Sequence, residues 1–522
     1  YGGTLRWVLG HQTPTLLVAV ATLVLTVLLY TIVPKGFFPV QDTGVIQGIS
    51  EAPQSISFLG MAEKQQLLTQ VILKNPAVKS LSSFIGVDGA NPTLNSGRIL
   101  INLKPLEERK VNATEVTRQL QRELAKVKGI TLYMQPVQDL TVDARVSRTQ
   151  YHYTLEDPDI KELNRFAPKL VEALRAQPEL RDVSSDQQDK GLRIAITIDR
   201  RTASRLGITP QLFVNTLYDA YGQRQVSIIF TQLNQYRVVL VVKPDFQQDP
   251  DRLPAIFFRN ASGGQVPLGA IAGVKETTGP LNISRQGQFP AVTLSFNPAP
   301  GVSLGKAIKA VESATQRLGT PASIGPSFQG TAQAFKASLT NQPLLILAAL
   351  VTVYIVLGVL YESYIHPITI LSTLPSAGVG AALSLLVSRT ELTVIAVIGI
   401  VLLIGIVEKN GILMVDFALE LERKGGKRPA EAIYEACLLR FRPILMTTMA
   451  ALLGAVPLAL GRGVGSELRH PLGIAIIGGL IFSQVLTLYT TPVIYLAFDR
   501  LARRMRQRSQ DRDGIANFTQ LP

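Results

Sequence analysis

Cysteine and histidine are scarce in this chain, and their scarcity limits its chemistry. The 522 residues include one cysteine, Cys437, and four histidines, at positions 11, 152, 366 and 470. A single cysteine excludes an intrachain disulfide framework and any multi-cysteine metal site, and the histidines show no metal-ligand spacing. We therefore expect no metal site and no cofactor.

Thioether sulfur is scarce as well. Of six methionines, only Met61 and Met134 fall in the long polar part of the chain, far apart in sequence. A carrier of soft metal ions would need clustered thioethers there. Copper and silver are therefore not expected as substrates.

Nucleotide-binding and catalytic motifs are also missing from the sequence. Residues 301–307, GVSLGKA, resemble a phosphate-binding loop, but the glycine spacing is one residue short and alanine replaces the Mg²⁺-binding hydroxyl. The polar part of the chain carries no acid–base or nucleophile constellation. These gaps argue against an enzyme and against ATP binding, so any transport by this chain should draw on an ion gradient.

Apolar sequence, by contrast, is abundant. Mean hydropathy is +0.23, and 47% of the residues are hydrophobic while 17% are charged, which indicates membrane spans joined to a large aqueous part. The first apolar run stands alone, and the others follow one another after the polar region 34–342. The six segments long enough to cross a bilayer are residues 13–33, 343–360, 367–388, 392–419, 443–460 and 471–498.

The net charge of +14 is concentrated beside these spans. An excess of lysine and arginine marks cytoplasmic flanks, so the polar region 34–342 is expected outside and the tail 501–522 inside. Since no aromatic-interleaved basic patch accompanies the charge, we do not expect nucleic-acid binding. The basic residues lie in one loop (Arg423, Lys424, Lys427, Arg428, Arg440, Arg442) and after the last span (Arg500, Arg503, Arg504, Arg506, Arg508, Arg512).

The polar region repeats a pattern of strands and helices. Residues 44–135 read as a β-α-β-β-α-β, ferredoxin-like unit. The same order starts again at 151–185, is interrupted, and resumes at 291–329; the insertion, 191–282, has its own strands and a helix. The predicted fold class is a six-span membrane α-helical bundle with a large α+β extracytoplasmic region of ferredoxin-like modules.

The span 392–419 carries Glu408, Lys409, Asn410 and Asp416. An ionisable residue costs roughly 2.5–3.5 kcal/mol at the centre of a spanning helix, so it is rarely kept without a task. Lys409 and Asp416 are seven residues apart and therefore share one helix face. One interpretation is that Glu408 and Lys409 snorkel to water at the cytoplasmic end; the other is a proton- or ion-coupled site.

Three motifs in this sequence resemble those of resistance-nodulation-division (RND) efflux pumps. Residues 405–418, GIVEKNGILMVDFA, are similar to the family's tenth-span motif, and residues 440–448, RFRPILMTT, to the start of its eleventh span. Residues 34–42, PKGFFPVQD, resemble the exit from its seventh span. With the arrangement of one span plus five, the likeness covers essentially the whole chain and is nearest the MdtB/MdtC type of hydrophobe/amphiphile exporter.

The resemblance implies the carboxy-terminal half of a pump, and the start at Tyr1 agrees with a piece of a longer polypeptide. It divides the chain into span seven (1–33), a first porter subdomain (34–147), a second porter module in two parts (148–190 and 283–340), an inserted docking subdomain (191–282), five spans (341–500) and a basic tail (501–522). It also implies a homotrimer or mixed trimer in a bacterial inner membrane. The expected partners are a periplasmic membrane-fusion adaptor protein and an outer-membrane channel, with protons driving multidrug efflux.

The resemblance also carries over individual residues. Lys409 matches the lysine that pairs with the proton-binding aspartates of span four, Arg440 the arginine at the cytoplasmic mouth, and Thr447 the hydroxyl of the proton relay. Asn410 and Asp416 belong to the same motif.

A glycine-rich stretch is the expected substrate path. Phe84, Gly86, Gly89 and Gly97 mark it, and we expect a mobile gating loop over residues 86–97, with a plain connection between two strands as the alternative. Family members that bind large aromatic drugs carry several phenylalanines there, whereas this stretch has one. Two other functions stay open: a non-transporting scaffold subunit of a mixed trimer, and an exporter of a lipid or siderophore-like amphiphile.

Overall fold

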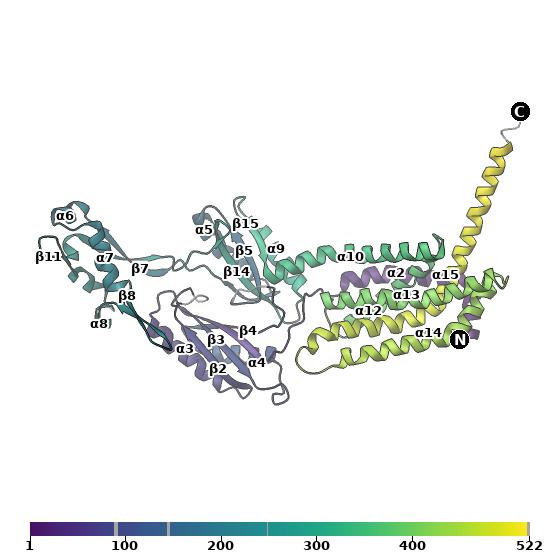
Figure 1. Cartoon of the computed structure of the whole chain (residues 1–522), viewed down its shortest axis with the longest axis horizontal. Coiled ribbons are helices and arrows are strands. Elements are labelled where there is room, and N and C mark those ends of the chain that lie inside the picture. Colours follow the sequence, from purple (N-terminus) through teal and green to yellow (C-terminus); the bar gives the residue numbers. More distant parts are fainter. Residues whose placement is uncertain (88–91, 143–146, 248, 519–522) are drawn as a thin grey trace.

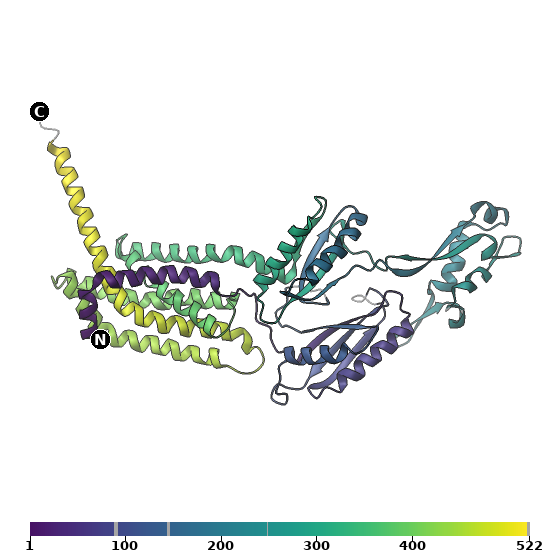
Figure 2. The ribbon, with the colours of Figure 1, turned by 180° about the vertical axis from the view of Figure 1, so that it is seen from behind.

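The protein is elongated, with a helical bundle at one end and two sheet-containing units beyond it (Figure 1). The computed structural model describes residues 1–87, 92–142, 147–247 and 249–518, and after residue 501 the course of the backbone alone. A small third unit projects from the far end of the sheet-containing region. Tyr1 lies at the opposite end of the molecule, where the last helix of the described chain projects away from the bundle (Figure 2).

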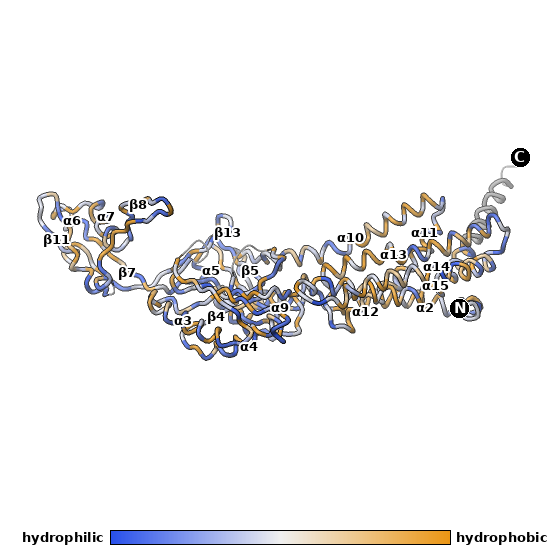
Figure 3. The backbone as a smooth tube through the Cα atoms, turned by 60° about the horizontal axis from the view of Figure 1, so that its bottom comes forward, coloured by the Kyte–Doolittle hydropathy of each residue, from blue (hydrophilic) through white to orange (hydrophobic). Residues whose placement is uncertain are grey.

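Among the residues that the structure describes, six helices or helix pairs of the bundle are long and apolar enough to cross a membrane, as the sequence predicts. Hydrophobic residues dominate this part of the chain (Figure 3). The bundle helices are α1 (Gly2–Gly10), α2 (Gln12–Ile32), α10 (Gly330–Tyr361), α11 (His366–Leu371), α12 (Leu374–Val387), α13 (Val394–Arg423), α14 (Pro429–Leu460) and α15 (Ser466–Phe518).

The ends of these helices differ from the predicted ones, and proline is the reason. Pro343, Pro443 and Pro471 were predicted to begin spans, but each lies inside a helix that starts earlier. In a membrane bundle, neighbouring helices and local adjustments satisfy the carbonyls that an internal proline leaves free. The predicted basic loop is therefore short, because α13 runs to Arg423 and α14 begins at Pro429.

The predicted span 367–388 is not one continuous helix. It is interrupted at Ser372 and Thr373, which separate α11 from α12. Pro375 stands at the start of α12 and has no amide hydrogen to continue the ladder. The backbone of both residues stays in the right-handed helical region, so the interruption is a local change of hydrogen bonding rather than an unwound segment.

The first sheet-containing unit has the predicted order of elements. Its four strands are antiparallel in the order β2-β3-β1-β4. Burial alternates along β1, because successive side chains of a strand point to opposite faces of the sheet. The two helices of this unit each bury one face against the sheet, because side chains three or four residues apart share a helix face. The elements are β1 (Val45–Glu51), α3 (Phe58–Leu73), β2 (Val78–Ile85), β3 (Ser96–Leu103), α4 (Ala113–Leu124) and β4 (Thr131–Pro136).

The second unit is assembled from two parts of the chain, again as predicted. Its sheet has the order β13-β14-β5-β15, with β6 paired to β14. The long strand β14 therefore joins the segment before the insertion to the segment after it. The elements are β5 (Tyr151–Glu156), α5 (Ile160–Arg175), β6 (Leu180–Ser185), β13 (Arg285–Gln286), β14 (Phe289–Pro298), α9 (Leu304–Leu318) and β15 (Gly325–Gln329).

The insertion between these parts is richer in structure than the sequence indicated. A two-stranded ribbon of β7 and β12 connects it to the second unit, and its small core contains Phe213 stacked on Phe258. The elements are β7 (Gly191–Ile198), α6 (Arg200–Arg205), α7 (Pro210–Tyr221), β8 (Arg224–Phe230), β9 (Gln235–Leu240), α8 (Pro244–Gln247), η1 (Pro250–Ala255), β10 (Phe257–Arg259), β11 (Gln265–Pro267), η2 (Leu268–Ala270) and β12 (Ala272–Gly279).

The segment 34–42, which leaves α2, ties the bundle to both sheet-containing units. Its first residues pair with the start of α13, where the Leu392 amide donates to the Pro34 carbonyl at 2.8 Å. Phe37 enters the core of the second unit and meets the ring of Phe335 on α10. At its other end, Asp42 is anchored in the first unit.

Asp42 makes a buried ion pair with Arg109 and accepts a hydrogen bond of 2.8 Å from the Ala113 amide at the start of α4. Burial alone would raise the pKa of Asp42, but the hydrogen bonds from Arg109, Ala113 and Gly44 outweigh it and lower the pKa. The stability that this carboxylate contributes is therefore present at neutral pH and is lost as pH falls through the lowered folded-state value.

Arg109→Ala should destabilise the first unit by about 3–5 kcal/mol, because it leaves the Asp42 carboxylate buried without its cation. Amide hydrogen exchange of β1 and α4 in the membrane-embedded protein measures the loss. Arg118→Ala is the matched control: its pair with Glu115 is largely exposed, so it should cost less than about 1 kcal/mol. Equal protection in both variants would contradict the anchoring role of Asp42.

Candidate functional site

The charged residues of α13 divide between two faces of the helix. Lys409 and Asp416 are exposed on the surface of this bundle and share one face, as their spacing predicts. Glu408 and Asn410 are buried, at 4% and 3% exposure. The motif therefore presents two charges outward and two polar groups into the bundle.

Lys409 lies near the middle of α13, and Arg423 at its end is 14 positions further along the chain. At about 1.5 Å per residue, that is roughly 21 Å of helix, and a similar length precedes Lys409. A lysine side chain cannot reach the end of the helix over that distance.

A buried hydrogen bond sets the register between α13 and α14. The Asn410 amide nitrogen donates to the Thr448 hydroxyl at 3.2 Å and lies 3.5 Å from the Gln484 side-chain oxygen on α15. Thr447, the neighbour of Thr448, is therefore at the same depth as Lys409. The Thr447 hydroxyl donates to the Ile444 carbonyl of its own helix at 3.1 Å and is otherwise exposed.

Arg440 lies two turns before Thr447 on α14. Its guanidinium carbon is 4.6 Å from the centre of the ring of Phe417, the residue that follows Asp416 on α13. Because the two helices run in opposite directions, Asp416 and Arg440 form a second level, two turns from the level of Lys409 and Thr447. Within the described chain, no ion pair joins Lys409, Asp416 or Arg440 to another residue.

The sequence thus identified residues that the structure brings together, but it did not separate their roles. Asn410 holds helices in register and faces away from Lys409. Its partners Thr448 and Gln484 were missed, and so was the inward orientation of Glu408. Thr448 and Glu408 are polar residues next to the predicted site residues Thr447 and Lys409, and this position was the available sequence signal for them.

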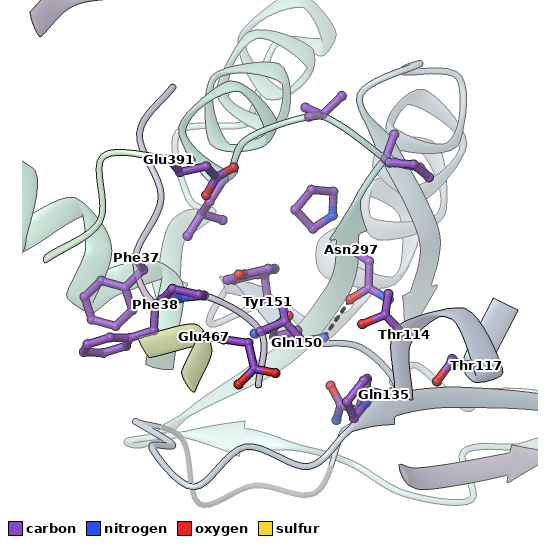
Figure 4. A pocket seen from close by; sticks show the side chains of 18 of the residues that line it. Phe37, Phe38, Thr114, Thr117, Gln135, Gln150, Tyr151, Asn297, Glu391 and Glu467 are labelled. Carbon is purple, nitrogen blue, oxygen red and sulfur yellow. Dashed lines mark hydrogen bonds between the residues drawn. The ribbon is translucent and has the colours of Figure 1, made fainter. Parts of the chain in front are cut away.

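A second candidate site is a cavity of about 590 Å³ between the two sheet-containing units and the ends of the spans (Figure 4). Aromatic surface comes from Phe37, Phe38 and Tyr151. The backbone amide of Gln150 donates to the side-chain oxygen of Asn297 at 3.0 Å across the floor of the cavity. The carboxylates of Glu391 and Glu467 come from the links before α13 and at the start of α15. Residues 37 and 38 belong to the segment 34–42, so that motif was the sequence signal for a site that we did not predict.

The cavity wall carries charges of both signs, since Arg118, Arg181 and Arg389 line it together with Glu391 and Glu467. Burial raises the pKa of Glu391, and neither Glu391 nor Glu467 forms an ion pair among the described residues. One carboxyl oxygen of Glu467 is buried without a hydrogen-bond partner. Burial also raises the pKa of Tyr151. The cavity therefore combines apolar rings with both carboxyl and guanidinium groups.

The predicted glycine-rich path needs correction. Gly97 lies inside β3 rather than in a loop, and an added Cβ would come within 2.7 Å of the Ser50 hydroxyl, so close packing of strands explains this glycine. Gly89 lies outside the described residues. Gly86 adopts a φ of +99°, which suits glycine, and follows the end of β2.

The end of β2 presents more aromatic surface than its sequence indicates. Phe84 is 55% exposed, and Phe58, from the first turn of α3, is 48% exposed and lies beside Gly86. Ser83 faces α3, because the Gln65 side chain donates to its hydroxyl, so the neighbouring Phe84 lies on the other face of β2 and the two rings are separate exposed surfaces. The second ring was missed because it is distant in sequence.

Groups of three or more histidine, cysteine, aspartate or glutamate side chains that could hold a metal ion do not occur among the residues the structure describes.

Comparison with known proteins agrees with the sequence motifs. Residues 1–499 match the family model described as the AcrB/AcrD/AcrF family. Two solved structures of similar fold are crystal forms II and I of a heavy metal efflux pump, each with a TM-score of 0.84 and 23% sequence identity over 95% of this chain. The chain covers 52% and 51% of those two proteins, about half their length. The chain belongs to the AcrB/AcrD/AcrF family of RND efflux transporters.

Proposed function

We propose that this chain forms part of a proton-driven efflux transporter that exports drugs or other amphiphiles. Members of its family are transporters rather than enzymes. The observation that carries the proposal is Lys409, which stands at mid-helix on a face that the rest of this chain leaves open. A charged lysine at that depth needs a carboxylate partner, which would come from the remainder of the polypeptide.

Proton coupling follows from what such a pair can do. If the partner carboxylates take up a proton, their attraction to Lys409 weakens and the helix pair can rearrange. Thr447, at the depth of Lys409, is suited to pass a proton, and Arg440 and Asp416 form the next level toward the cytoplasm. Helices α13 and α14 would then change position according to protonation.

The basic flanks support an orientation in which the sheet-containing units lie outside the cytoplasm. We propose that the two units are ferredoxin-like porter modules, that the insertion 191–282 is a docking subdomain, and that the membrane is a bacterial inner membrane. A trimer acting with an adaptor protein and an outer-membrane channel is the matching assembly.

The cavity near Phe38 and the exposed rings of Phe58 and Phe84 are the proposed substrate contacts. The cavity volume falls within the range of drug-sized ligand sites. Its wall carries charges of both signs, and its aromatic rings would bind the apolar part of an amphiphile.

Lys409→Ala in the full-length pump should abolish export driven by a proton gradient, because it removes the cation that responds to protonation. Thr447→Val should lower the rate as well. Proteoliposomes with an imposed pH gradient measure both, together with the amount of assembled protein. If Lys409→Ala leaves export unchanged in a pump assembled to normal levels, proton coupling through this chain is wrong and the scaffold role gains support.

Thr448→Val is the matched control for Thr447→Val. It removes the acceptor of the Asn410 hydrogen bond and should lower bundle stability by about 0.5–1 kcal/mol. Thr447 bonds only its own helix, so Thr447→Val should leave thermal stability in detergent unchanged. Identical stability and transport losses in the two variants would assign Thr447 a structural role.

Phe84→Ala should weaken export of aromatic substrates by roughly two- to tenfold, since a lost aromatic contact costs about 0.5–1.5 kcal/mol. Export of small, nonaromatic amphiphiles should change less. Phe257→Ala is the control, because Phe257 is equally exposed, at 55%, but lies in the insertion. Equal effects of both changes on every substrate would remove Phe84 from the substrate path.

A further inference from the structure

Glu408 is the most deeply enclosed carboxyl group of the described membrane helices. Its side chain is 4% exposed, and its Oε1 atom is buried without a hydrogen-bond partner in the described structure. Lys409, the next residue, is exposed on a different side of α13. Glu408 is therefore enclosed by the helices of this chain and does not depend on whatever covers Lys409.

The break between α11 and α12 lies against Glu408. Gly411, one turn further along α13, packs on this break: a Cβ there would lie 3.4 Å from the Thr373 methyl and 3.8 Å from the Ile370 Cα. Because α12 and α13 run in opposite directions, Glu408 is level with the first turn of α12. Thr373 and Ser376, at 1% and 4% exposure, are the buried hydroxyls of that turn.

Helix α15 adds polar groups at the same depth. It runs parallel to α13, and the contact of Asn410 with Gln484 places Ser483 near the level of Glu408, with Thr487 one turn below. The Thr487 hydroxyl and the Gln484 amide nitrogen are buried without partners in the described chain. Unsatisfied polar atoms are uncommon in protein interiors, so these groups, on the Asn410 side of α13, and the Glu408 Oε1 atom mark polar interior of the bundle at this depth.

Few charges face this site. Helix α12, residues 443–460 of α14 and residues 471–488 of α15 contain no titratable side chain. Lys409 and Asp416 occupy another face of α13. Outside these segments, the titratable groups of the neighbouring helices are Lys336, Tyr354 and Tyr361 on α10, His366 on α11, Glu431, Tyr434, Glu435, Cys437, Arg440 and Arg442 on α14, and Glu467, Arg469, His470, Tyr489, Tyr495, Asp499 and Arg500 on residues 466–501 of α15.

An ionised carboxylate in such surroundings would lack both a cation and enough donors, which is costly in a low-dielectric interior. In this conformation we therefore expect Glu408 to be a protonated carboxylic acid. We propose that Glu408 is a second proton-exchanging site, built within this half of the bundle and separate from the level of Lys409 and Thr447. The break between α11 and α12 is the element whose movement would admit water and release the proton.

The role of Glu408 in transport rests on the proposed function, whereas the protonation of Glu408 can be measured independently. Infrared difference spectroscopy of the full-length protein in lipid, across a pH titration, should show the carbonyl band of a buried carboxylic acid that disappears in alkaline medium. Glu408→Gln should lose that band. Glu408→Asp keeps a carboxyl group and should retain a shifted band, which guards against a general folding defect.

Glu420→Gln is the matched control on the same helix, because the Glu420 carboxylate is exposed and paired with Lys424 at 2.9 Å. It should leave the band unchanged. A band that is absent from the parent protein, or that persists at every pH, would overturn the inference, since the group would then be permanently ionised or permanently neutral. Full transport by Lys409→Ala would refute the proposed coupling without affecting this spectroscopic result.

Discussion

The low dielectric of the bilayer interior is the constraint from which this account is built. A lysine at the centre of a membrane helix is stable only with a carboxylate partner or a path to water, and α13 is too long on both sides of Lys409 to offer that path. The same constraint explains why Asn410 is hydrogen bonded between helices and why an isolated Glu408 is expected to carry a proton. One helix thus holds a cation, a register-setting amide and a carboxyl group on distinct faces.

The contacts of segment 34–42 connect this helix to the sheet-containing units. Leu392, just before α13, is hydrogen bonded to the segment, Phe37 is buried in the second unit, and Asp42 is held in the first unit by Arg109. A displacement of the outer end of α13 would therefore act directly on both units and on the cavity that Phe37 and Phe38 line. Such a contiguous set of packed and hydrogen-bonded groups is what coupling between a proton site and a substrate site requires.

Much of this organisation could be predicted from the sequence, because periodicity reports burial directly. Six apolar runs indicated the six candidate spans, and alternation along β1 and the pattern of α4 indicated the first sheet-containing unit. Helix ends were less predictable, since the effect of Pro343, Pro443 and Pro471 depends on neighbouring helices that the local sequence does not reveal. Gly97 was assigned to a loop for a similar reason: only the paired strands show that it is required for close packing.

The candidate site was predictable in its membership but not in its geometry. The spacing of Lys409 and Asp416 gave their common face, and the motif gave Thr447 and Arg440. Contacts between distant segments, such as Asn410 with Thr448 or Phe58 with Gly86, depend on tertiary packing. For that reason the inward orientation of Glu408 and the cavity at Phe37 appeared only in the structure.

The most direct test of the central claim is the distance from the Lys409 amino group to the nearest carboxylate in an experimental structure of the complete pump in lipid. The account predicts that, in at least one conformation, this distance is within about 4 Å and that the carboxylate comes from the part of the polypeptide outside this chain. A lysine that faces lipid in every conformation, or that pairs only with residues of this chain, would contradict it.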